Sequence, residues 1–294
     1  MKATSRMVAF PWTGIRSSVS GMTASGHILS PTGQNAIHLV ETAPRPLVGF
    51  AADYPAGMLT RCHSHPRAQL LYAVTGVMRI DTPTTAYTVP PSLALVLPAH
   101  MLHTVRMDGP VAMRALFLRE DAATRASRTG VIAVSALLRE VVLAACAEPV
   151  EWTLDGRGHH LTELALDEIA RATPLPLGLP MARDPRLCRV IAALTDRPND
   201  PTGLDGLASL AGASPRTLAR LFRAETGLSF RQWRQQARMT EALRALTTGA
   251  TPAQAATVAG YASQPAFGAA FRTLFGRTPA DTRRRLEGTP QNVA

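Results

Sequence analysis

Two histidines separated by one residue, His63 and His65, have the type and spacing that most directly indicate chemistry in this chain. Side chains two positions apart on a β-strand point to the same side, so both imidazoles are expected to face one space. Imidazole nitrogen is a good ligand for Zn, Cu, Fe and Ni. Cys62 directly precedes His63 and should point the opposite way, so we do not expect it to be a ligand. The segment predicts a binding site inside a small β-structure.

The sequence around these histidines resembles the two motifs of cupin barrels. Residues 57–76 match the first motif, G-x5-H-x-H-x3-E-x6-G, at every spacing, with Gln69 in place of its glutamate. Residues 98–103 resemble the second motif, P-x-G-x2-H, with His100 in place of its glycine and His103 at its end. The resemblance implies one site made of three imidazoles and one amide oxygen, from His63, His65, Gln69 and His103.

Three uses of that site remain open at this point. It would hold a divalent transition metal (Ni, Zn, Fe, Co or Cu), line a small-molecule pocket, or form a hydrogen-bonded core without a ligand. Glutamine in place of glutamate removes one negative charge, which weakens a metal site and disfavours harder ions.

The elements that must position these residues read as β-structure. From about Leu47 to Leu118, short apolar runs alternate with glycine and proline turns, which is typical of an antiparallel barrel or sandwich. Residues 131–147 and 159–172 then show helical spacing, and the proline-rich residues 173–185 read as a linker. Leu137, Leu138 and Val141 form either a dimer seam or a face packed on their own barrel.

Nearly everything beyond residue 185 is predicted to be helical, and two stretches have the form of a helix-turn-helix. In residues 203–227 the turn is at Gly212, Ser214 is the N-cap and Gly227 ends the second helix. Residues 251–276 repeat this pattern with Gly260, Ser263 and Gly276. The full set of expected helices spans residues 186–196, 203–211, 215–226, 230–248, 252–259, 265–275 and 279–286.

The tandem arrangement resembles a known family. Residues Gly260-Tyr-Ala-Ser, Phe267, Phe271-Arg272, Phe275-Gly276 and Pro279 are similar to the C-terminal signature of the AraC/XylS transcription regulators, some of which carry a cupin sensor. The resemblance implies a seven-helix domain whose two recognition helices enter successive major-groove segments of DNA.

Arginines on the first recognition helix are the expected base readers. Arg216 and Arg220 lie one helical turn apart, opposite the apolar positions, so both can reach guanine edges in one groove. Arg223 and Arg272 are expected to meet phosphate. The second helix carries Pro265 and small residues, so it should contribute mainly fit. The complete set of predicted DNA contacts is Ser214, Arg216, Thr217, Arg220, Arg223, Ser263, Gln264 and Arg272.

Composition agrees with a nucleic-acid partner. The net charge is +10, and residues 181–294 hold 16 arginines against 8 acidic residues, whereas residues 1–180 are nearly balanced. The run Arg283-Arg284-Arg285 reads as a solvated helix end. Three scattered cysteines and the lack of a long apolar run favour a reducing cytoplasm and no membrane span.

We therefore expect an α+β protein of two domains: an N-terminal antiparallel, cupin-like β-barrel with linker helices, and a C-terminal all-α domain with tandem helix-turn-helix motifs. The expected bounds are a loose arm (1–46), the barrel (47–128), linker helices with a role in dimerisation (129–183), the DNA-binding domain (184–287) and a tail (288–294). The expected function is a homodimeric, non-enzymatic regulator of promoter DNA that responds to a metal ion or small effector. The alternatives are a cupin metalloenzyme (dioxygenase or isomerase) and a regulator whose barrel only dimerises.

Overall fold

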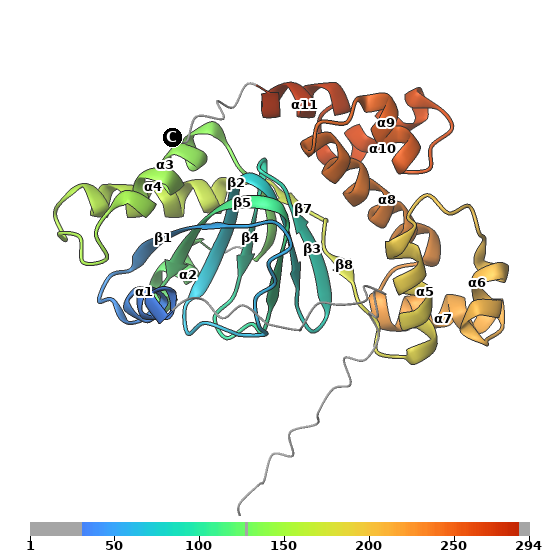
Figure 1. Cartoon of the computed structure of the whole chain (residues 1–294), viewed down its shortest axis with the longest axis horizontal. Coiled ribbons are helices and arrows are strands. Elements are labelled where there is room, and N and C mark those ends of the chain that lie inside the picture. The colour runs from blue at the N-terminus through green and yellow to red at the C-terminus, as the bar shows by residue number, and fades with distance from the viewer. Residues whose placement is uncertain (1–30, 127–128, 288–294) are drawn as a thin grey trace, which may run out of the picture.

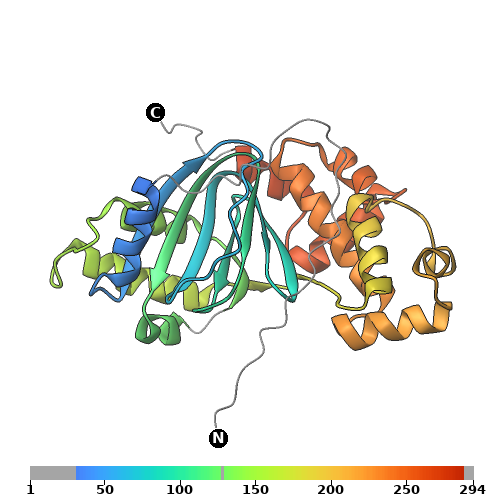
Figure 2. The same cartoon turned by 60° about the horizontal axis from the view of Figure 1, so that its bottom comes forward.

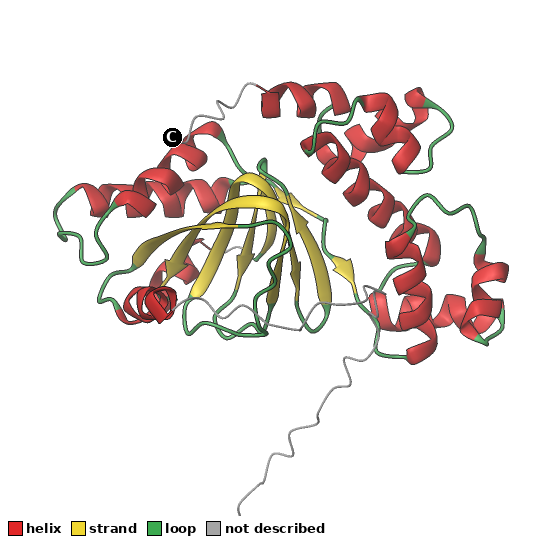
Figure 3. Cartoon of the chain, viewed as in Figure 1, coloured by secondary structure: helices red, strands yellow, loops and turns green. Residues whose placement is uncertain are grey.

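The computed structural model describes residues 31–126 and 129–287, and these form a curved sheet with covering helices followed by an all-helical part (Figure 1). The two-domain α+β expectation is confirmed. Figure 3 shows the division directly, with strands confined to the N-terminal part. No described helix is long and apolar enough to cross a membrane.

All strand pairs of the sheet are antiparallel, and β2 is its centre. The hydrogen-bonded path runs β1-β5-β2-β4-β6-β7, with β3 beside the second half of β2 and β8 beside β3. Within the described residues this path does not return to β1, so the expected barrel is a strongly curved open sheet. The strands are β1 (Leu47–Tyr54), β2 (Ala68–Asp81), β3 (Thr85–Val89), β4 (Leu93–Leu97), β5 (Thr104–Leu118), β6 (Gly130–Ala133), β7 (Pro174–Leu175) and β8 (Leu179–Pro180).

The sheet buries both faces, because apolar residues follow one another along its central strands. On β2, Leu71 and Ala73 belong to the core inside the curve, whereas Leu70 and Tyr72 belong to a second core on the outer face. Three helices cover that outer face: α2 (Glu120–Ala126), α3 (Ala136–Ala147) and α4 (Arg157–Arg171). Figure 2 shows α3 and α4 beside the strands.

Two expectations about the flanks of the sheet are wrong. Part of the supposed loose arm is helix α1 (Pro31–Thr42), whose Val40 is buried in the inner core; residues 1–30 of that arm lie outside the described residues. Residues 129–183 are not a linker with helices alone. They add strands β6, β7 and β8 to the sheet. Val131 and Ile132 of β6 pair with β4, and Ser135 then caps α3.

The C-terminal part contains the seven helices implied by the family resemblance. They are α5 (Pro185–Asp196), α6 (Leu204–Ala211), α7 (Pro215–Thr226), α8 (Phe230–Thr247), α9 (Pro252–Val258), α10 (Gln264–Phe275) and α11 (Pro279–Glu287). The predicted punctuation is confirmed. Ser214 accepts a hydrogen bond from the Thr217 amide at 3.1 Å, and Gly212, Gly227, Gly260 and Gly276 all adopt positive φ.

The two helix-turn-helix units have separate cores. Leu218, Phe222 and Trp233 belong to the core of α5, α6, α7 and the start of α8. Phe267 and Phe271 belong instead to the core that continues inside the curved sheet. The second unit therefore shares its core with the inner face of the sheet, whereas the first unit meets the sheet through β8, which lies beside it in Figure 1.

Candidate metal site and DNA-binding surface

Three of the four predicted ligands meet at one end of the sheet. His63 and His103 form an isolated antiparallel bridge, with N···O distances of 3.0 and 2.8 Å. One ring nitrogen from each of His63, His65 and His103 lies within 4.8 Å of the others. The two histidines of the first motif precede β2 instead of lying on a regular strand, so the strand argument was wrong in detail. The bridge to His103, and not a strand pleat, brings the rings together.

The Nδ1 atoms of all three rings already have partners. Nδ1 of His63 lies 2.7 Å from the Arg61 carbonyl, and Nδ1 of His103 lies 2.9 Å from the Met101 carbonyl. Because a carbonyl only accepts, each Nδ1 carries the proton and each Nε2 keeps its lone pair. Histidines that bind metals are usually oriented by such a contact at the other nitrogen.

Burial keeps two of these imidazoles neutral. Burial lowers the pKa of His63, and it lowers the pKa of His103 to about 4. A neutral imidazole offers its lone pair without first losing a proton, which is what a metal ligand must do.

Gln69 contributes an amide to the same region. It lies on β2 directly opposite Phe117 of β5, and the Phe117 ring is 5.0 Å from the His65 ring. Gln69 is only 4% exposed, and its Oε1 is buried without a hydrogen-bond partner. Nε2 of His103, which is 2% exposed, is likewise buried without a partner. Buried polar atoms are rarely left unpaired, so these two acceptors are the atoms of the site that still lack a partner.

Two residues that the sequence did not reveal support the site: Glu41 on α1, and Arg67, which directly precedes β2. Glu41 Oε1 lies 2.6 Å from Nδ1 of His65. The buried Arg67 donates to the carbonyls of Glu41, Ala43 and Arg45 at the C-terminal end of the helix. No motif marks Glu41, because its role depends on a helix that packs beside the histidines across the fold.

The glycine of the second cupin motif has a visible backbone role here. His100, which replaces it, has a φ of 62° and is the one non-glycine residue with positive φ in the described part of the chain. Its amide donates to the His65 carbonyl at 2.7 Å, although its side chain is exposed. Cys62 is exposed and is not part of the histidine group, in agreement with the expectation.

The first recognition helix presents its arginines to solvent. Arg216, Arg220 and Arg223 on α7 are exposed, whereas Leu218 and Phe222 on the opposite side are buried. Within residues 31–126 and 129–287 these three arginines form no ion pair, so their charge is available to a partner. Thr217 is half-buried, and its hydroxyl lies 2.9 Å from that of Ser214.

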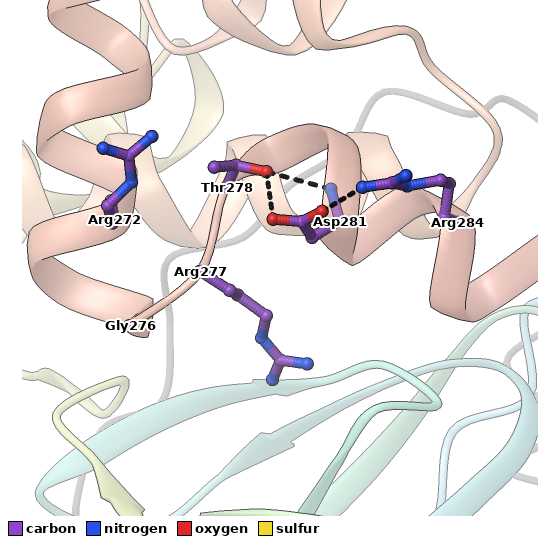
Figure 4. Close-up of a pocket in the computed structure, with 6 residues that line it drawn as sticks. All are labelled: Arg272, Gly276, Arg277, Thr278, Asp281 and Arg284. Atoms are coloured by element: carbon purple, nitrogen blue, oxygen red, sulfur yellow. Dashed lines mark hydrogen bonds and ion pairs between the residues drawn. The ribbon is translucent and has the colours of Figure 1, made fainter.

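The second recognition helix, α10, exposes fewer long polar side chains than α7 does. Ser263, Gln264 and Arg272 are exposed, while Phe267, Phe271 and Phe275 are buried. Beyond α10 a pocket of about 380 Å³ is lined by Arg272, Gly276, Arg277, Thr278, Asp281 and Arg284 (Figure 4). Arg284 pairs with Asp281, and Arg272 stays the predicted phosphate contact on this side.

Comparison with known proteins agrees with both halves of the structure. The protein-family model described as AraC-like ligand binding domain matches residues 46–172, and the family model described as helix-turn-helix domain matches residues 207–285. The HTH-type transcriptional regulator NimR of Escherichia coli K12 is 30% identical over 224 residues, which are 76% of this chain and 82% of NimR. Regulatory protein SoxS of the same organism is 35% identical over 98 residues, or 33% of this chain and 92% of SoxS.

A solved AraC-type transcriptional regulator from Chromobacterium violaceum is 26% identical, with a TM-score of 0.34 over 35% of this chain and 94% of that chain. The domain matches and the extent of the NimR similarity give the family. The chain belongs to the AraC family of HTH-type transcriptional regulators, and it joins a DNA-binding domain to an AraC-like ligand-binding domain.

Proposed function

We propose that this regulator responds to a divalent transition metal held by His63, His65 and His103 with the Gln69 amide oxygen. The observation that carries the proposal is the pair of buried acceptor atoms without partners, His103 Nε2 and Gln69 Oε1, together with the group of three imidazoles to which His103 belongs. Both atoms are acceptors, so they cannot pair with each other, whereas a bound cation would take a lone pair from each.

The ligand set indicates which metals fit. Three neutral nitrogens and one neutral oxygen suit Ni, Zn, Co, Cu or Fe better than Mg or Ca, which prefer carboxylate oxygens. The site brings no charged ligand, and Glu41 reaches the metal position only through the ring of His65. Such a site suits reversible binding by a sensor, because fewer charges hold the cation.

On the DNA side, we propose that Arg216, Thr217 and Arg220 read bases while Arg223 and Arg272 contact phosphate. Ser214, Ser263 and Gln264 would supply short polar contacts at the helix starts. The exposure of these side chains and the absence of ion pairs at the α7 arginines support the assignment. Metal binding would alter DNA affinity if the protein has two arrangements of its domains, one that binds DNA better than the other, and if these two arrangements bind the metal with different affinity.

Metal content is the first test. Purified full-length chain, freed of metal, is titrated with Ni, Zn and Co and compared with His63→Ala and His103→Ala. His160→Ala is the matched control, because its exposed imidazole lies on α4 away from the site. We expect one site per chain in the wild type and the control, and none in the two site variants. Equal binding by all four proteins would refute the site.

Regulation is the second test. Mobility-shift titrations on a DNA site selected in vitro are run with and without the metal that binds. We expect a change in affinity of about 5- to 150-fold, which is the usual range of coupling between two sites. An unchanged affinity, together with normal metal binding, would leave a structural metal and would exclude metal-dependent regulation.

A further inference from the structure

Two arginines of α8 bind the loop that leads into the first helix-turn-helix unit, and one of them also lies against the turn of the second unit. Arg234 donates to the carbonyls of Thr202 and Asp200, at 2.8 and 2.6 Å. Arg238 donates to the carbonyls of Pro198 and Asp200, at 2.9 and 3.3 Å. Both side chains therefore bind the α5–α6 loop, residues 197–203, which leads into the first unit.

The same loop meets the turn of the second unit. A Cβ placed on Gly260 would lie 3.0 Å from the Arg238 guanidinium and 3.2 Å from the Cα of Asn199. Gly260 thus has a second role beside its φ of 70°, since a side chain there would separate the turn from Arg238 and from the loop. Arg238 touches elements of both units at one point.

This point coincides with the boundary between the two cores. Trp233 and Ala237 of α8 pack in the core of the first unit, whereas Met239 and Ala242 pack in the core of the second. Arg238 lies at that boundary, between Ala237 and Met239, and Arg234 lies one helical turn before it.

Burial and like charge both disfavour the charged form of Arg234. Two half-buried guanidinium groups lie side by side, and burial together with the charge of Arg238 lowers the pKa of Arg234. The loop offsets this cost with carbonyl oxygens. It is itself braced by the Asp200 carboxylate, which accepts from the Thr202 amide at 2.7 Å.

We propose that Arg234 and Arg238 are positioning residues that fix the distance and rotation between the two recognition helices, and so determine which spacing of the two DNA segments the protein accepts. The α8 helix spans only part of the way from one groove to the next, about 27 Å for 18 residues. One inserted base pair moves the second segment by about 3.4 Å and turns it by about 35°. A rigid pair of units rejects such a change, and a flexible pair tolerates it. The proposal rests on the DNA-binding function and is independent of the metal.

The test is in vitro selection of DNA sites from a random pool by the full-length chain, followed by affinity measurements on the selected site with one or two base pairs inserted. The variants are Arg234→Ala/Arg238→Ala and the milder Arg238→Lys, which keeps the charge and loses the forked contact. Arg231→Ala is the matched control: it removes an exposed charge from the same helix. Thermal unfolding checks that each variant is folded.

For the wild type and Arg231→Ala we expect one fixed spacing and at least about a tenfold loss of affinity for one inserted base pair, which is the scale of a mismatched contact. For the double variant we expect several spacings and less than a threefold loss on insertion, with Arg238→Lys in between. The proposal is overturned if the double variant, or Arg238→Lys where the double variant does not fold, selects the same single spacing. It is also overturned if affinity falls equally on all spacings, because the arginines would then act only as phosphate contacts.

Discussion

At the scale of single residues, Arg220 is the sharpest prediction on the DNA side. It is exposed on α7 and forms no ion pair among the described residues. We expect Arg220→Ala to weaken binding to the specific site by about 1–3 kcal/mol, the value of a bidentate contact to guanine. Arg171→Ala, which removes an exposed charge from α4, is the control and should leave affinity unchanged in mobility-shift titrations at fixed salt. Equal affinities of the two variants would remove Arg220 from the base readers.

Glu41 is the residue-scale prediction for the metal site. Its carboxylate orients His65 through a 2.6 Å contact. Loss of such an outer partner usually lowers metal affinity by about 10- to 100-fold, so we expect this change for Glu41→Ala in a metal titration. Glu151→Ala, an exposed acidic residue outside the site, should bind as the wild type does. A wild-type affinity for Glu41→Ala would show that the His65 ring is held by its neighbours alone.

His103 predicts a pH dependence of stability in the metal-free protein. Its folded-state pKa of about 4 lies below the unfolded value of about 6.5, so the unfolded chain takes up the proton first as pH falls. The stability from this group is complete above pH 6.5 and is lost towards pH 4, a difference of about 3 kcal/mol at roughly 1.4 kcal/mol per pH unit.

Denaturant unfolding at pH 7 and pH 4.5 measures this difference by circular dichroism. We expect His103→Gln to lose less stability on acidification than the wild type. His160→Gln should lose as much as the wild type does. If His103→Gln shows the full wild-type loss, other groups cause the acid sensitivity.

At the scale of elements, the close packing of α3 on β1 depends on Gly49. A Cβ there would lie 2.4 Å from the Ala145 carbonyl oxygen. We expect Gly49→Ala to destabilise the protein by about 1–3 kcal/mol, because the helix must move away from the strand. Gly268→Ala on α10 is the control. A Cβ at that position would have no atom of another segment within 4 Å. Alanine in a helix is neutral or stabilising by up to about 1 kcal/mol relative to glycine. Thermal unfolding compares the two variants, and equal midpoints would contradict the packing argument.

The same packing decides between the two uses proposed for the helix after the sheet. Leu138 and Val141 are buried against the outer face of the sheet, so these two residues pack on their own domain. Leu137 is 48% exposed and is the member of the trio that faces away. Dimerisation stays a prediction, and the buried pair does not supply its seam.

At the scale of the whole molecule, residues 178–180 form a short strap that joins the sheet to the DNA-binding domain. Strand β8 pairs with β3, and the Pro180 carbonyl accepts from the Trp233 indole at 2.9 Å. The Gln236 amide donates to the Gly178 carbonyl at 2.8 Å. The linker predicted from its prolines is thus docked along α8, and it offers a physical connection between the ligand-binding domain and the recognition helices.

We expect Gln236→Ala to reduce the effect of metal on DNA affinity while leaving metal binding itself intact. A coupling of 1–3 kcal/mol is typical between two sites, and the loss of these contacts should remove a large part of it. Gln235→Ala, the exposed neighbour on the same helix, is the control. Mobility shifts with and without metal measure the coupling, and unchanged coupling in Gln236→Ala would exclude the strap as its route.

The sequence by itself determined the local features of this protein. Ser214, Gly212, Gly260 and Gly276 placed the turns of both helix-turn-helix units correctly, because caps and positive φ depend on the residue and its immediate neighbours. The resemblance to the two cupin motifs likewise indicated that His63, His65 and His103 share a site, although the bridge between His63 and His103 that brings the rings together is a long-range contact.

Only the tertiary structure decided what lies across the fold. Glu41 approaches His65, and Arg238 binds Asp200 and lies against the turn at Gly260, through contacts between segments far apart in the sequence. Residues 174–175 and 179–180 became strands because sheet edges accepted their backbone groups, although their prolines indicate a linker. Such contacts depend on which surfaces meet, and residue type and local spacing do not specify that. The histidine site was therefore visible in the sequence. The helix that orients it, and the arginine contacts between the two DNA-binding units, were not.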